Sequence, residues 1–285
     1  MTAVLRGVDA DRALHRLRAL ARPAPPLGEL GDDLLGTSRT RLILAVGRPL
    51  AVAGLYAVAW SSGHWIVALS VVPLVFLVNV CVLHDLMHQS LGLSRRANRV
   101  LLSALGLVIL DSGHALQATH LEHHRRFPSA ADPEAYLAGW PIWRILVEGP
   151  SYRYRLWAWA WSTRPERRRR LCAEYAAHAV LVATAVVCAV VGTAPAVSAY
   201  VATSVVGAWT FPLISVAAVH DARASSELRR SRTLRGRVVP KVMFGMGYHL
   251  EHHLWPNIPA HHLPAAARRV TRLLDQHRAA VTRVP

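Results

Sequence analysis

Four long apolar runs are the feature that most constrains how this chain can fold. Each run has close to the ~20 residues that a helix needs to cross the hydrocarbon core of a bilayer. The runs are Leu42–Trp60, Trp65–Leu83, Cys172–Thr193 and Ala196–Val219. Hydrophobic residues make up 53% of the 285 residues and charged residues only 18%, which argues against a disordered chain and against an ordinary soluble domain. The sequence therefore predicts an all-α, polytopic membrane protein with four transmembrane helices.

The four predicted helices form two hairpins, because the connection within each pair is very short. Ser61–His64 joins the first pair and Ala194–Pro195 joins the second, and neither connection contains lysine or arginine. All but one of the 33 basic residues lie near the two termini or in the long segment between the hairpins. By the positive-inside rule, we expect both termini and this middle segment in the cytoplasm, at the cell membrane. Nucleic-acid binding is disfavoured despite a net charge of +16, because the arginines flank spans and form no separate basic domain.

Three regions are expected along the chain. Residues 1–41 form a cytoplasmic N-terminal segment, in which the leucine spacing of Asp9–Arg22 predicts an amphipathic helix. Residues 42–265 form the membrane domain, and residues 266–285 form a cytoplasmic C-terminal tail. A shorter apolar run, Leu101–Leu110, is too short to span and is predicted to be re-entrant or interfacial.

Histidines are abundant and clustered in this chain, which has 16 of them. His84–His88 has the pattern HxxxH, whereas His120–His124 and His249–His253 both read HLEHH. Residues three and four apart share a helix face, so each cluster, or box, points its imidazoles to one side. Imidazole is the commonest neutral metal ligand and suits iron, zinc, copper and nickel. The three boxes, expected in a cytoplasmic helical cap on one side of the membrane, therefore indicate a metal site.

His220 is a ninth candidate ligand, although it stands alone in the sequence. It directly follows the fourth predicted span, as His84 follows the second, so both are expected at the same depth. The alternative for His220 is a solvated interfacial histidine. Nine imidazoles are too many for one metal, since a catalytic zinc uses about three protein ligands, and they suit two metals with four or five nitrogens each. The candidate ligands are His84, His88, His120, His123, His124, His220, His249, His252 and His253.

Five acidic residues near the boxes are candidates for orienting the ligands. A carboxylate that accepts the far N–H of a ligand imidazole fixes the tautomer and the direction of the ring. For each of the five, a solvated carboxylate is an equally good interpretation. The candidates are Asp85, Glu122, Asp132, Asp221 and Glu251.

The order, spacing and placement of the boxes resemble those of integral membrane fatty acid desaturases, a superfamily that also contains carotenoid ketolases and hydroxylases. The resemblance covers most of residues 42–265, and its most specific part is GYHLEHHLWPNIP at 247–259. Asp132-Pro133-Glu134 is similar to the segment after the second box in bacterial members. The first box departs from the HxxxxH of the acyl-CoA delta-9 type. Val216 stands where some members have an asparagine, so no ligand is expected there.

The resemblance implies a non-haem di-iron centre at the cytoplasmic face, with two iron ions held by the nine histidines and O2 as co-substrate. It implies an oxidoreductase of lipid metabolism, with fatty-acyl desaturation as the leading activity and carotenoid ketolation or hydroxylation as the alternative. Such chemistry needs a metal with oxygen, because side-chain acids and bases do not cleave unactivated C–H bonds. Less favoured alternatives are a zinc-dependent intramembrane hydrolase, which would leave about six histidines unexplained, and a non-enzymatic metal-binding protein.

Two partners follow from the resemblance. The substrate is expected to be a lipid or acyl chain that enters from the membrane. Electrons are expected from a separate donor, such as ferredoxin with its reductase, because no cytochrome, ferredoxin or flavin motif occurs in the sequence. The basic cytoplasmic face would attract an acidic donor.

Overall fold

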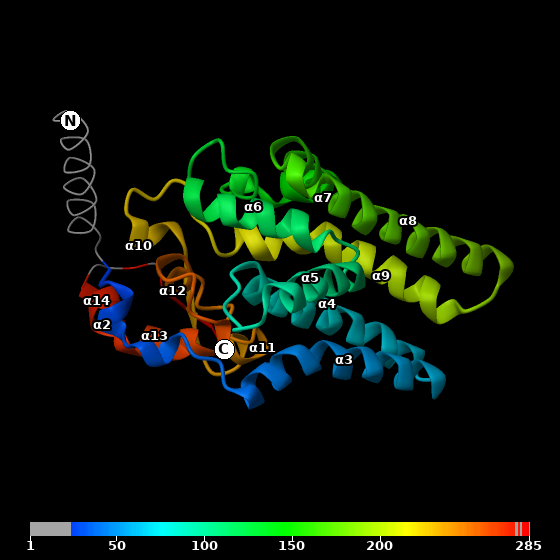
Figure 1. The fold of residues 1–285 in the computed structure, drawn as a ribbon, viewed down its shortest axis with the longest axis horizontal. Helices are drawn as coiled ribbons and strands as arrows, with labels where there is room; N and C mark the ends of the chain where they lie inside the picture. The colour runs from blue at the N-terminus through cyan, green and yellow to red at the C-terminus, as the bar shows by residue number, and fades with distance from the viewer. Residues whose placement is uncertain (1–23, 277–278, 280, 285) are drawn as a thin grey trace.

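Long helices lie alongside one another in the elongated part of the molecule (Figure 1). The computed structural model describes residues 24–276, 279 and 281–284, so the helix predicted at Asp9–Arg22 lies outside the described residues. The stretches long and apolar enough to cross a membrane are Asp32–Ser61, Trp65–Met87, Pro165–Val191 and Pro195–Ala217. They coincide with the four apolar runs, which confirms the expectation of a mostly helical membrane protein.

The four spans pack in pairs and expose apolar side chains on their outer faces. Their long helices are α3 (Arg39–Ser61), α4 (Trp65–Met87), α8 (Arg168–Val191) and α9 (Pro195–Pro212). Single-turn elements adjoin them, namely η1 (Asp32–Leu34), η3 (Pro165–Arg167) and η4 (Leu213–Ala217). Helix α3 packs against α4, α8 packs against α9, and α4 also contacts α9. Leu50 is 72% exposed and Val190 is 82% exposed, as suits helices surrounded by lipid tails. The direction in which the spans cross the membrane stays a prediction.

The short apolar run forms half of a sharply bent helix pair. Helices α5 (Arg95–Val108) and α6 (Gly113–Arg126) meet at 105° across a break of a few residues. Glycine is required at the corner, because a Cβ on Gly113 would lie 2.0 Å from the Leu102 carbonyl oxygen. The bend agrees with the expected re-entrant or interfacial role and turns the second histidine box back toward the end of α4.

Helix α7 lies beside the membrane helices and contacts α6 and α9 (Figure 1). It covers Ile142–Thr163 and follows the short turn η2, Ala135–Leu137. It approaches α9 closely at Gly149, where an added Cβ would lie 2.4 Å from the Trp209 ring. The Trp209 indole N–H donates to the Leu146 carbonyl oxygen at 2.6 Å, which fixes the two helices in this close contact.

Short elements at the other end of the molecule form a compact group, here called the cap. Its elements are α2 (Leu27–Leu30), α10 (Glu227–Arg230), β1 (Thr233–Arg235), α11 (Val239–Val242), α12 (His249–Leu254), η5 (Ala260–His262), α13 (Leu263–Arg269), α14 (Thr271–Gln276) and β2 (Val281–Arg283). Strands β1 and β2 form a parallel pair with Thr233 opposite Val281. Strands of three residues have too few positions for an alternating pattern, so the sequence did not predict this sheet.

The cap has one apolar core that draws on distant parts of the chain. Leu34 from η1, Leu250 from α12, Leu263 from α13 and Leu274 from α14 are all fully buried in it. The Trp255 indole N–H donates to the Pro25 carbonyl oxygen at 3.1 Å. The third histidine box is therefore held between segments from both ends of the sequence. The first two boxes lie outside the cap, on α4 and α6, although the sequence analysis expected the cap to carry all three.

Candidate metal centre

The first box closes helix α4. His84 lies in its last turn, and His88 is the residue that caps it. The HxxxH spacing brings the two imidazoles together, with ring centroids 5.2 Å apart. Both ring nitrogens of His84 and the Nε2 atom of His88 are buried and have no hydrogen-bond partner. Buried polar atoms without partners are uncommon, so this corner of the molecule is suited to an additional ligand.

The second box is oriented by two carboxylates from the segment after α6. The Nδ1 atom of His123 lies 2.7 Å from Asp132 Oδ2, and the Nδ1 atom of His120 lies 2.9 Å from Glu134 Oε2. Asp132 is itself fixed, because its other oxygen accepts from the backbone N–H of Glu134 at 2.8 Å. Each carboxylate accepts the Nδ1–H proton, so the Nε2 atoms keep their lone pairs for a metal.

His220 joins the centre through backbone pairing. The segment after η4 forms an isolated antiparallel bridge between His220 and Ser231, and Thr233 forms another with Tyr248, just before the third box. His220 Nδ1 donates to the Val216 carbonyl oxygen at 3.1 Å, which leaves its Nε2 atom free to accept. A histidine that stands alone in the sequence is thereby held against α12. Its side chain is buried, which contradicts the solvated interfacial alternative.

The nine histidines form two adjacent groups. The first contains His84, His88, His120 and His252, and the second contains His123, His220, His249 and His253. Within each group, the candidate ligand atoms lie within 4.8 Å of one another. His124 belongs with the first group, because its Nε2 atom is 2.8 Å from that of His252 and 3.2 Å from that of His120. The groups thus offer five and four imidazoles.

The donor geometry fits two metal ions. In the second group, the Nε2 atom of His220 lies 3.0 Å from that of His123 and 2.9 Å from that of His249. His123 and His220 both carry their proton on Nδ1, so their Nε2 lone pairs face each other and cannot form a hydrogen bond. A cation removes this repulsion, and bonds of about 2.1 Å at right angles place two nitrogens about 3.0 Å apart.

The protonation states also suit metal binding. Burial, followed by the charges of neighbouring imidazoles, lowers the pKa of His249 and His253 well below the usual histidine value. Both are therefore neutral near pH 7, the form in which imidazole binds a metal.

Among the five acidic candidates, Asp132 bonds a candidate ligand and the other four bond different groups. Asp85 accepts from the backbone N–H of Ala260 at 2.9 Å, which ties α4 to the cap. Asp221 accepts from the backbone N–H of Arg223 at 3.0 Å.

Glu122 and Glu251 occupy the third position of their HLEHH boxes and face away from the histidines. That position is about 200° around the helix from the first histidine, so it points to the opposite side. Glu122 pairs with Arg126 and with Arg164, the latter at 3.0 Å. Glu251 accepts a hydrogen bond from the Thr233 hydroxyl, and burial raises its pKa. The helical period alone could have excluded both as partners of the ligand histidines.

Glu134 also orients a candidate ligand, although the sequence pattern did not single it out. It accepts from His120 and also from the Thr119 hydroxyl at 3.0 Å. The sequence feature that could have identified Glu134 is its position two residues after Asp132. Both residues lie in the segment that is similar to bacterial desaturases.

An apolar cavity of about 420 Å³ leads from the histidines into the membrane region. Its walls come mainly from α4 and α9. Phe76 and Phe211 both line it, and their rings pack edge to face with centroids 5.8 Å apart. His84, His120, His123, His220 and His249 line its inner end. Val206 and Ile214 line it as well and are about half exposed on the lipid-facing surface, at 53% and 54%. The cavity therefore connects both histidine groups with the side of the protein that contacts lipid.

Comparison with known proteins agrees with this site. The family model for fatty acid desaturases matches residues 58–285, which include all three boxes and His220. A comparison with curated proteins gave no match. Since the family match covers most of the sequence, the chain belongs to the fatty acid desaturase family of oxidoreductases.

Proposed function

We propose that this protein is an O2-dependent, non-haem di-iron oxidoreductase that introduces a double bond into the acyl chain of a lipid. The observation that carries the proposal is the apolar cavity, because it links lipid-facing walls to both histidine groups. A flexible alkyl chain is the kind of substrate that such walls accept without unpaired polar groups.

The residues of the chain have distinct parts in this reaction. His84, His88, His120, His124 and His252 would hold one iron, and His123, His220, His249 and His253 would hold the other. When bound, two iron ions supply the O2 activation that cleavage of an unactivated C–H bond requires. Asp132 and Glu134 hold the protons of His123 and His120 on Nδ1, away from the metals.

The cavity walls position the chain and exclude water. Phe76 and Phe211 restrict its path, and Leu116 and Met246 are among the apolar residues near the histidine end. Exclusion of bulk water protects reactive species from side reactions. Specificity for the position of the double bond would then depend on how far along the cavity the acyl chain extends.

The environment of the enzyme remains part of the proposal. We place it in the cell membrane, with both termini and the metal centre on the cytoplasmic side. Its electrons would come from a separate donor such as ferredoxin with its reductase, and its basic surface suits an acidic partner. Nucleic acid is not a proposed partner.

Expression in a host that lacks desaturases tests this function. Total lipids are extracted and analysed by mass spectrometry for fatty acids and carotenoids. We expect acyl chains that have lost two hydrogens, and we expect none from a His123→Ala/His253→Ala variant. Oxygenated carotenoids with unchanged acyl chains would instead establish the ketolase or hydroxylase alternative. A protein that retains one zinc and no iron while active would contradict the di-iron centre.

A further inference from the structure

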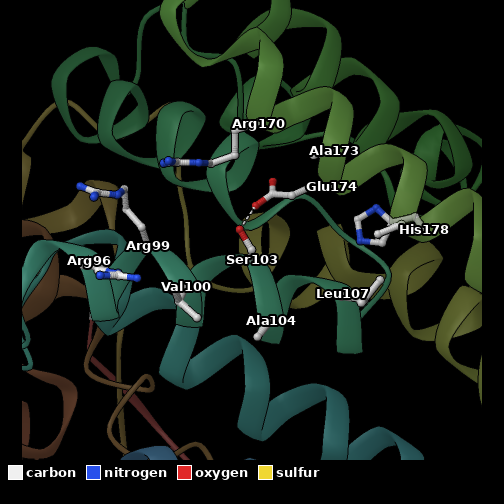
Figure 2. A pocket seen from close by; sticks show the side chains of 11 residues that line it. Arg96, Arg99, Val100, Ser103, Ala104, Leu107, Arg170, Ala173, Glu174 and His178 are labelled. Carbon is white, nitrogen blue, oxygen red and sulfur yellow. Dashed lines mark hydrogen bonds between the residues drawn. The ribbon is translucent and has the colours of Figure 1, made fainter.

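A second cavity lies between α5 and α8, apart from the metal centre. It has a volume of about 550 Å³, and Figure 2 shows the side chains that line it. Helix α5 contributes Arg96, Arg99, Val100, Ser103, Ala104 and Leu107, and helix α8 contributes Arg170, Ala173, Glu174, Ala177 and His178. None of these residues lines the cavity proposed for the substrate. We call this feature the α5–α8 groove.

Charge and apolar surface are separated along the groove. Arg96 and Arg99 lie in the first two turns of α5, and Arg170 lies in the first turn of α8. Figure 2 shows their side chains gathered at one end, with Leu107 and His178 toward the other. Since α8 rises about 1.5 Å per residue, Ala177 lies about 10 Å below Arg170 along the span. The groove thus has a basic mouth at the start of a membrane span. Its deeper lining consists mainly of small and apolar side chains, together with Ser103, Glu174 and His178.

The basic mouth is not neutralised within the described residues. Arg96, Arg99 and Arg170 take part in none of the ion pairs found there. Glu174 is the acidic residue of the groove, and its carboxylate accepts from Ser103 and Ser112 at 2.5 Å each and from His114 Nδ1 at 2.6 Å. The oxygens of the Glu174 carboxylate therefore accept hydrogen bonds from these side chains and form no ion pair with the three arginines.

His114 links Glu174 to Arg170. Because its Nδ1–H donates to Glu174, its Nε2 atom accepts, and it lies 3.1 Å from Arg170 Nη1. This contact is with a neutral ring, so Arg170 keeps its full charge at the mouth. Three guanidinium groups consequently face a common space without a carboxylate partner in the described part of the chain.

We propose that the α5–α8 groove binds an anionic phospholipid. The phosphoryl headgroup would lie among Arg96, Arg99 and Arg170, since guanidinium groups bind phosphate oxygens with two hydrogen bonds each. An acyl chain would lie along Val100, Ala104, Leu107 and Ala177. Basic pockets between membrane helices are typical sites for anionic lipid headgroups. A soluble acidic protein would contact the arginines but not the apolar part, which lies beside the span.

Native mass spectrometry of the purified full-length protein tests the site. The protein is titrated with phosphatidylglycerol and with phosphatidylcholine of identical acyl chains, and bound lipids are counted. The groove variant is Arg96→Gln/Arg99→Gln/Arg170→Gln. The control, Arg95→Gln/Arg169→Gln/Arg39→Gln, removes the same charge from exposed arginines of α5, α8 and α3 that do not line the groove. Thermal unfolding without added lipid establishes that each variant is folded.

We expect the wild type and the control to retain one phosphatidylglycerol, and the groove variant to bind it at least about tenfold more weakly. Ala104→Trp, which fills the apolar part and keeps all three arginines, should lose phospholipid as well. Competition with inorganic phosphate and with glycerol 3-phosphate distinguishes a site that binds only the headgroup from a site that binds the whole lipid. If either competes fully with phosphatidylglycerol and Ala104→Trp has no effect, the site binds free phosphate and the proposal is wrong.

Two further outcomes would also contradict the proposal. Equal retention of phosphatidylglycerol by the groove variant and the control would show that the groove is not the site. Unchanged lipid retention, together with weaker binding of the electron donor by the groove variant, would assign the arginines to a protein partner.

Discussion

Asp132 and His123 form a buried pair in which the carboxylate Oδ2 lies 2.7 Å from Nδ1, with both side chains 1% exposed. This pair fixes the ring of His123 toward the second histidine group. Replacing Asp132 with alanine removes the acceptor, so we expect affinity for the second iron to fall by about 10- to 100-fold. The iron content of the purified protein, measured by plasma emission, checks this. Asp221→Ala is the matched control, because Asp221 adjoins His220 but bonds the backbone N–H of Arg223. An equal loss of iron in both variants would contradict the assignment.

Loss of one ligand from each box should abolish turnover while the protein still inserts into the membrane. His88→Ala, His123→Ala and His252→Ala each remove a candidate ligand without changing a lipid-facing surface. Membrane fractionation and mass spectrometry of lipids measure the two properties separately. A near-normal amount of product from any of these variants would show that the box containing the changed histidine is not part of the catalytic centre.

His220→Ala tests the ligand that has no box. We expect this variant to lose activity and to retain less than the full iron content, since the second group would keep three imidazoles. His262→Ala is the control, because His262 bonds the Gly36 carbonyl oxygen and belongs to neither histidine group. Full activity with unchanged iron in the His220 variant would leave eight histidines in the centre.

The width of the substrate cavity depends on Gly207. A Cβ at this position would lie 3.2 Å from the Phe76 ring, and a larger side chain would enter the cavity. We expect Gly207→Leu to reduce turnover of long acyl chains by about tenfold or more, with iron content unchanged. Gly47→Leu is the control, because nothing lies within 4 Å of the corresponding Cβ. If Gly207→Leu processes all chain lengths normally, the acyl chain does not pass this point.

Cysteine labelling tests the predicted orientation of the spans. In a background without Cys81, Cys172 and Cys188, Ser62→Cys should react with an impermeant reagent from outside the cell, and Ser225→Cys should react only after permeabilisation. Both positions are exposed, whereas Ser231, next to the same segment, is 2% exposed and would not report topology. The reverse labelling pattern would place the metal centre outside.

The sequence revealed the features that repeat or extend along the chain. The spans were predicted because apolar runs of bilayer length have few alternative structures. The boxes were recognised because i, i+3 and i+4 spacing directs histidines to one helix face. The roles of Glu134 and of the bridge between His220 and Ser231 were not predicted. Both depend on how loops fold back against the histidine helices, and no local sequence periodicity indicates such long-range contacts.

The cap core has a consequence for how the enzyme is made. Its third box rests on Leu263 and Leu274, which the ribosome adds after all three boxes and all four spans have been synthesised. Both histidine groups include residues of the third box, so neither group is complete until α12 is held in place by the cap. Under the proposed function, the metals would then be loaded late in maturation, and a nascent chain stalled before residue 263 would leave its histidines open to the wrong ion.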